Sequence, residues 1–163
     1  MIEASPLRSA LAPWRVILLS CLGASLLACG DPADPEPKTV FWPLDFESRW
    51  PEVRDCRASP AEHDGYSIRV FSDPASEQAY RDGEYPFVPG AQVVKGEYAD
   101  EACTQLERVS GMQKLESGEA PELHDWLWQR ADPRGKLSNE KPARSCAGCH
   151  EQCSSRDYTC TDP

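Results

Sequence analysis

The chain has 163 residues, of which 27 are acidic and 17 basic, and its formal net charge is −10. This length fits one domain, and the acidity argues against a nucleic-acid partner, because few basic side chains are present to neutralise phosphates. An apolar content of 40% suffices for a small core and excludes wholesale disorder. No apolar stretch reaches the roughly 20 residues of a membrane-spanning helix.

The amino-terminal sequence indicates a targeting segment. Two arginines precede a short apolar run over residues 16–27, which is typical of a secretory signal. The run ends in Leu-Leu-Ala-Cys, which resembles the lipobox of bacterial lipoproteins, with Cys29 as the lipid-modified first residue. The alternative is an ordinary secretory signal that leaves Cys29 a free thiol. We expect a signal peptide over 1–28 and, because Gly30 follows the cysteine, an outer-membrane lipoprotein with its domain in the periplasm or outside the cell.

Downstream of the signal, residues 29–40 are rich in proline and charge and predict an extended tether. Residues 41–163 then form the single folded domain. Alternating apolar residues predict strands, and Asp73-Pro74 predicts the start of a helix that Gly83 ends. The fold class is α+β, with one antiparallel sheet and flanking short helices. The expected elements are a helix within 41–56 interrupted near Pro51, a strand 66–71, a helix 74–82, a strand 91–98, a strand 106–115 broken at 110–111, and a strand 124–131.

A Cys-Ala-Gly-Cys-His pentapeptide lies near the carboxyl end, at 146–150. C-x-x-C-H is the attachment signature of c-type haem. Cys146 and Cys149 lie one helical turn apart, so both thiols can add to vinyl groups on one side of a porphyrin, and His150 then reaches the iron. Such haem is assembled outside the cytoplasm, which agrees with the signal. One covalent haem c is therefore expected.

The same cysteines allow other interpretations. The four carboxyl-terminal cysteines could form a zinc site or two disulfides, and the C-x-x-C pair could be a redox pair. With the haem cysteines set aside, the remaining four allow three pairings. An acylated or metal-bound thiol is the alternative to a disulfide there. We expect one local and one long-range disulfide, namely Cys153–Cys160 and Cys56–Cys103.

Three stretches, 72–98, 111–129 and 146–150, together resemble the cytochrome P-460 family and its relative cytochrome c′-β. The resemblance covers about residues 66–150 and implies a largely antiparallel sheet that carries haem. In P-460 members a lysine is covalently joined to the porphyrin, and the matching residue here is Lys95. On a strand, Lys95 shares a face with Val93 and Glu97. This sequence departs from the family's strand ending, because Gly96 separates Lys95 from Glu97.

The resemblance implies an enzyme that oxidises hydroxylamine to nitric oxide or nitrous oxide at an iron held by His150. A distal base would take up the released protons, with Glu140 as the first choice and Glu97 as the second; either could equally be a solvated carboxylate. An outside acceptor would receive the electrons, because only one haem motif is present. The alternatives are a c′-β-like protein that binds nitric oxide without turnover and a simple electron-transfer cytochrome. The partners expected are thus a small nitrogen ligand, the electron acceptor, the membrane, and a second copy of the chain if it dimerises.

Several other side chains have both a haem-related and an ordinary interpretation. Three aromatic residues could line a haem pocket or simply pack in the core, and Met112 could be a sixth iron ligand or a core residue. Two histidines are expected at the surface or in caps. These residues are the aromatic Phe87, Trp126 and Trp128 and the histidines His63 and His124.

Overall fold

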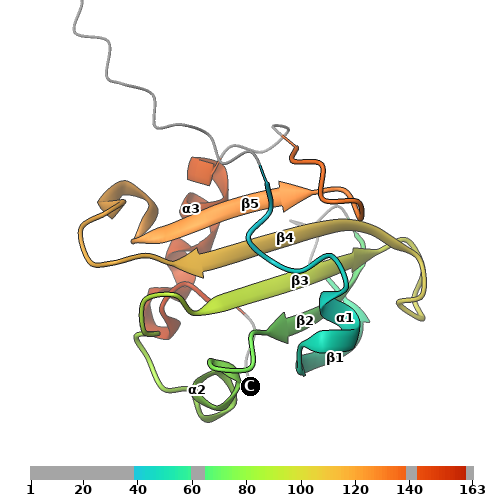
Figure 1. The fold of residues 1–163 in the computed structure, drawn as a ribbon, viewed down its shortest axis with the longest axis horizontal. Coiled ribbons are helices and arrows are strands. Elements are labelled where there is room, and N and C mark those ends of the chain that lie inside the picture. Colours follow the sequence, from blue (N-terminus) through green and yellow to red (C-terminus); the bar gives the residue numbers. More distant parts are fainter. Residues whose placement is uncertain (1–38, 60–64, 139–142, 161–163) are drawn as a thin grey trace, which may run out of the picture. The chain divides into compact units, whose positions relative to one another are not determined.

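The computed structural model describes residues 39–59, 65–138 and 143–160, and in these residues five strands form one sheet in the order β1-β2-β3-β4-β5. Each strand pairs antiparallel with the next along the chain. The α+β prediction is confirmed. Figure 1 shows the sheet with α3 behind it and α1 in front. The strands are β1 (Glu52–Ala58), β2 (Ser67–Ser72), β3 (Gln92–Tyr98), β4 (Leu106–Lys114) and β5 (Trp126–Ala131); the helices are α1 (Phe46–Arg49), α2 (Glu77–Asp82) and α3 (Ala143–His150), with 3-10 turns η2 (Pro121–Leu123) and η3 (Glu151–Arg156).

The two faces of the sheet have different coverings. We call face A the one that carries Lys95 and face B the one that carries Val94. On face B, Val94 pairs with Gly111 of β4 and packs in a cluster with Trp42 and Phe46. The amino-terminal segment is fastened there by hydrogen bonds as well, since the Phe41 N–H donates to the Gln129 side chain over 3.1 Å. Face B is thus a structural core closed by the start of the domain.

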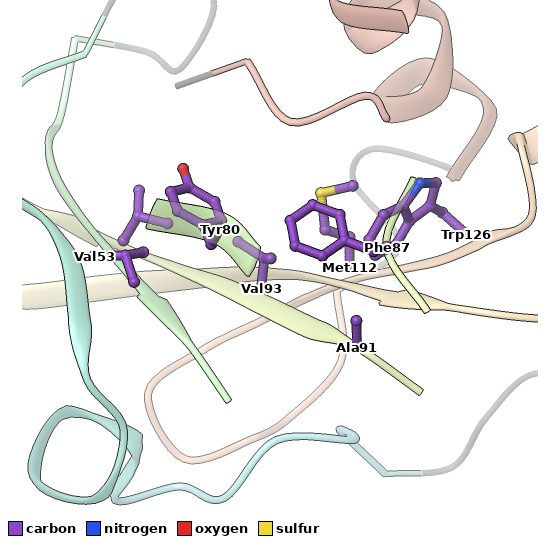
Figure 2. Close-up of a cluster of buried hydrophobic side chains, with 8 residues drawn as sticks. Val53, Tyr80, Phe87, Ala91, Val93, Met112 and Trp126 are labelled. Carbon is purple, nitrogen blue, oxygen red and sulfur yellow. The ribbon is translucent and has the colours of Figure 1, made fainter. Parts of the chain in front are cut away.

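The second core cluster, on face A, is drawn in Figure 2. Tyr80 of α2 packs beside Val53 and Val93, while Phe87 lies beside Met112 and Trp126. Tyr80 and Trp126 have no exposed surface. Burying a large apolar side chain contributes about 1.5–3 kcal/mol, so this cluster fixes α2 and the loop after it onto the sheet. The remainder of face A, towards Lys95, is polar.

Several sequence predictions need correction. Residues 52–58 form strand β1, not the second part of an interrupted helix, and α1 ends at Arg49 before Pro51. Helix α2 begins at Glu77 rather than at 74, because Asp73 Oδ1 accepts the N–H groups of Ala75 and Ser76 and holds a turn first.

Strand β4 is continuous through Ser110 and Gly111, where a break was predicted. Gly111 permits a close approach of the amino-terminal segment: a Cβ there would lie 2.5 Å from Cζ3 of Trp42. The predicted end of α2 is confirmed, since Gly83 caps the helix at φ 68°. The predicted alternation in β2, β3 and β5 is confirmed too, with Trp126 and Trp128 on one face.

Both expected disulfides are present. Cys56 of β1 is bonded to Cys103 in the β3–β4 connection, and Cys153 of η3 is bonded to Cys160. The second bond removes two of the four thiols that a carboxyl-terminal zinc site would need, so that alternative is wrong. No helix among the described residues is long and apolar enough to cross a membrane.

Candidate functional site

The carboxyl-terminal helix α3 presents the Cys-Ala-Gly-Cys-His motif. Neither Cys146 nor Cys149 is in a disulfide, whereas the other four described cysteines are. Cys149 is exposed and Cys146 half-buried, and the intervening Ala147 is buried against the body of the domain. The spacing of three residues places both thiols on one side of a helical turn. The helix therefore holds two reactive side chains at its surface and anchors itself through the residue between them.

The imidazole of His150 has a fixed orientation. Its Nδ1 lies 2.6 Å from the backbone carbonyl oxygen of Tyr158, and because that oxygen can only accept, Nδ1 carries the proton. The ring also meets the indole of Trp128 edge to face, with centroids 4.8 Å apart. Burial lowers the pKa of His150 against the opposing effect of the Tyr158 carbonyl, and Lys95 lowers it further. A neutral imidazole with Nδ1 committed has Nε2 left to coordinate a metal.

Lys95 lies on face A, paired with Val70 of β2 and Ser110 of β4. The predicted orientation of this residue is confirmed. Burial lowers the pKa of its amine to about 8, the charge of Glu97 opposes that shift, and Arg130 adds to it. The Cys146 thiol also acts on the amine. The sheet therefore brings Lys95 close to the motif on α3, although more than fifty residues separate them in the sequence.

Glu97, two residues along the same strand, is buried without any exposed surface. Its Oε2 accepts from Nε and Nη2 of Arg108 over 2.9 and 2.6 Å, and its Oε1 accepts from the Ser110 hydroxyl over 2.6 Å. Nη2 of Arg130 lies 3.5 Å from Oε2. Burial raises the pKa of Glu97, but Lys95, Ser110 and Arg108 together hold it below its usual range. Glu97 is thus an ionised carboxylate whose oxygens already have donors.

The other predicted site residues are placed as follows. Met112, Phe87 and Trp126 are buried in the core cluster of Figure 2, whereas the ring of Trp128 contacts that of His150. His124 stacks on Tyr158 with ring centroids 3.9 Å apart, and its Nε2 lies 2.8 Å from Oε2 of Glu151. The predictions for Cys29, His63 and Glu140 concern positions outside the described residues.

A family model for cytochrome P460 matches residues 44–161, which is most of the chain. The chain belongs to the cytochrome P460 family. It is accordingly a c-type haem protein, and the resemblance seen in the sequence is confirmed. A search of curated proteins found no match.

The residues of this cytochrome P460 member fit a c-type haem. Two cysteines outside the disulfides, one helical turn apart, supply the thiols that thioether attachment consumes, and the adjacent histidine uses Nδ1 for the Tyr158 carbonyl and keeps Nε2 for the iron. Outer-shell hydrogen bonds of this kind are what orient a metal-binding imidazole. When bound, the haem supplies the redox-active iron.

Sequence reasoning missed the partners of the predicted site residues. Arg108 and Arg130 meet Glu97 because β4 pairs with β3, and β5 pairs with β4, in a register that brings these side chains to one face. The sequence did contain an indication for Arg130, since it lies two residues after Trp128 and four after Trp126 on a predicted strand and so shares their face. The role of the Tyr158 carbonyl could not be predicted, because every residue has a backbone oxygen and the residue type does not show which one is used.

Proposed function

We propose that this cytochrome carries a single haem c, bound through thioethers to Cys146 and Cys149 and ligated by His150. The hydrogen bond between His150 Nδ1 and the Tyr158 carbonyl, 2.6 Å long, is the observation that carries the proposal, because it commits Nδ1 and leaves Nε2 to coordinate the iron. The presence on the same helix of two cysteines outside the disulfides supports it. We assign Met112 to the hydrophobic core, where it is buried, and not to the iron.

We further propose that the Nζ of Lys95 bonds to a carbon of the porphyrin ring. The amine is a suitable nucleophile, because its pKa of about 8 leaves a substantial neutral fraction near neutrality. Forming the N–C bond removes one hydrogen from the amine and one from the ring carbon as protons, and the electron pair goes to an oxidant such as a peroxide. The influence of Cys146 on the amine supports the required proximity.

The reaction that this site would serve is oxidation of hydroxylamine to nitric oxide or nitrous oxide. Each substrate molecule gives up equal numbers of electrons and protons, and the electrons leave to an outside acceptor. The chain's own contribution is proton uptake and positioning. Glu140 is our first choice of base, because both oxygens of Glu97 are engaged by Arg108 and Ser110. Glu97 then has an electrostatic role, because its carboxylate is the negative partner of Arg108 on face A.

A second function, binding of nitric oxide without turnover as in cytochrome c′-β, is favoured by one observation. The buried Glu97 carboxylate lies close enough to raise the pKa of Lys95, so a charged lysine also has a stabilising neighbour in an uncross-linked state. The two functions differ in whether the Lys95 amine is consumed.

The deciding experiment is peptide mass mapping of the protein produced in a host that matures haem c. We expect one haem peptide that contains both residues 146–150 and Lys95, and an absorption band at longer wavelength than an ordinary haem c. Lys95→Ala should retain haem under denaturing electrophoresis, return an ordinary c-type spectrum, and lose hydroxylamine turnover with an added electron acceptor. An unmodified Lys95 peptide would move the assignment to the nitric oxide binder, and loss of haem on denaturation would refute thioether attachment.

We also propose that Cys29 is acylated and anchors the protein in the outer membrane, with the haem domain in the periplasm or outside the cell. The Leu-Leu-Ala-Cys sequence after a short apolar run supports this. Cys29→Ser should release the protein from membrane fractions. A wild-type protein that is soluble in the periplasm with an unmodified amino terminus would contradict the anchor.

A further inference from the structure

The segment that follows His150 is a closed loop with an unusual backbone. Turn η3 ends at Arg156 and is capped by Asp157, and the disulfide Cys153–Cys160 closes the loop. Asp157 and Tyr158 both lie in the left-handed region, at φ 46° and 67°. Residues other than glycine adopt this region infrequently, and two in succession require the surrounding structure to hold them.

Asp157 is what holds this loop against face A. Its side chain is 7% exposed and accepts from three separate segments of the chain. Its Oδ2 accepts the N–H of Phe87 over 2.9 Å, while its Oδ1 accepts from Lys114 Nζ over 2.7 Å and from the indole N–H of Trp126 over 3.4 Å. A single carboxylate thus ties the loop to the ends of β4 and β5 and to the loop before β3.

This arrangement affects the orientation of the His150 imidazole. The next residue after Asp157 is Tyr158, whose carbonyl accepts from Nδ1 of His150. The Tyr158 ring is itself held by stacking on His124, with an interplanar angle of 8°. The direction of this carbonyl follows from the left-handed conformation of its own residue and the one before it. The carbonyl is therefore aimed by a fixed loop and does not depend on α3 itself.

We propose that Asp157 is a positioning residue for the proximal iron ligand: by fixing the turn at 157–158, it aims the Tyr158 carbonyl at Nδ1 of His150 and so sets the orientation and donor strength of the imidazole. The inference rests on the proposed ligation of iron by His150. An Nδ1–H that donates strongly makes the ring a better electron donor, which stabilises ferric over ferrous iron. A looser turn would weaken that hydrogen bond and raise the reduction potential.

The test is the haem-loaded Asp157→Asn variant, because asparagine keeps the size and one acceptor but loses the ion pair with Lys114. We expect the equilibrium constant for reduction to rise about tenfold, the low end for an outer-shell partner, or about 59 mV for one electron. The iron–imidazole stretching band of the ferrous protein should move to lower frequency. Both are measured without substrate, by potentiometric titration and resonance Raman spectroscopy.

Asp73→Asn is the matched control. Asp73 also holds a turn through backbone N–H groups, those of Ala75, Ser76 and Gln92, but that turn precedes α2. The control should lose stability and leave the potential and the stretching band unchanged. If Asp157→Asn behaves like Asp73→Asn, with stability lost and both haem readouts unmoved, Asp157 is merely structural and the proposal is overturned.

Lys114→Met provides a second test, because it removes the cation that pairs with Asp157 and keeps an apolar side chain beside Trp126. It should raise the potential in the same direction, and the double variant with Asp157→Asn should add little, since both act on one ion pair. Fully additive shifts would overturn the proposal. Failure of the proposed function has a different signature: the wild-type protein itself would lack an iron–imidazole band.

Discussion

Glu97 shows at the residue scale how a buried charge is accommodated on the polar part of face A. An ionised carboxylate without solvent contact costs several kcal/mol unless its lone pairs are satisfied. Here one oxygen accepts from Arg108 and the other from Ser110, and Arg130 lies 3.5 Å away. Glu97 is in turn the carboxylate that both arginines approach. The cluster is therefore costly to disrupt from either side, whatever its net contribution to folding.

Glu97→Gln should destabilise the domain by about 3 kcal/mol at neutral pH, the low end for a broken buried pair, because the amide retains an acceptor for Arg108. Urea unfolding measures this. The matched control is Glu107→Gln on the same sheet, where the side chain is exposed and the change should stay within about 0.5 kcal/mol. Equal effects of the two substitutions would show that the buried cluster contributes nothing specific.

The comparison of the wild type with Glu97→Gln also predicts how the free energy of unfolding depends on pH. The folded-state pKa of Glu97 is lowered, so its contribution is present above the unfolded value of about 4.3 and is lost as pH falls through the folded value. The stability advantage of the wild type over Glu97→Gln should therefore be constant from neutrality down to about pH 5 and then shrink. An advantage that grows on acidification would contradict the sign.

At the scale of elements, the sequence predicted strands in which apolar and polar residues alternate. It did not predict features that depend on contacts with a distant segment of the chain. The strands β2, β3 and β5 were recognisable from alternation. Strand β1 was not, because it is an edge strand in which Val53 alone is fully buried and most of the other positions are charged. The motif on α3 was recognisable from its spacing, whereas the loop that orients His150 depends on Asp157, which reads as an ordinary turn residue.

The continuity of β4 through Gly111 gives an element-scale prediction. Gly111→Ala would place a methyl group 2.5 Å from the Trp42 ring and force the amino-terminal segment away from face B. We expect a loss of about 1–3 kcal/mol, measured by thermal unfolding. The cost should be smaller in a Trp42→Leu background, with a coupling of at least about 0.5 kcal/mol. A cost that is the same in both backgrounds would exclude the ring contact as its cause.

For the whole molecule, the two faces of the sheet have separate tasks. Face B is closed by the segment around Trp42 and holds an apolar core. Face A combines a core at one end with the ionic cluster and α3 at the other. The two disulfides lie in different parts of the domain, since Cys56–Cys103 joins the edge strand β1 to the β3–β4 connection, and Cys153–Cys160 closes the loop beside His150.

The two disulfides should therefore differ in what their removal changes. Cys56–Cys103 spans 47 residues and Cys153–Cys160 spans 7, so loop-closure entropy predicts losses of about 4 and about 2.5 kcal/mol. Paired Cys→Ala variants, compared by urea unfolding of the haem-loaded protein, measure the difference. The order of the haem effects should be the reverse, because the shorter loop carries the Tyr158 carbonyl that holds His150. Removing Cys153–Cys160 should move the reduction potential, and removing Cys56–Cys103 should leave it unchanged. If the longer crosslink shifts the potential as much as the shorter one, the haem environment depends on global stability and the two faces are not separate.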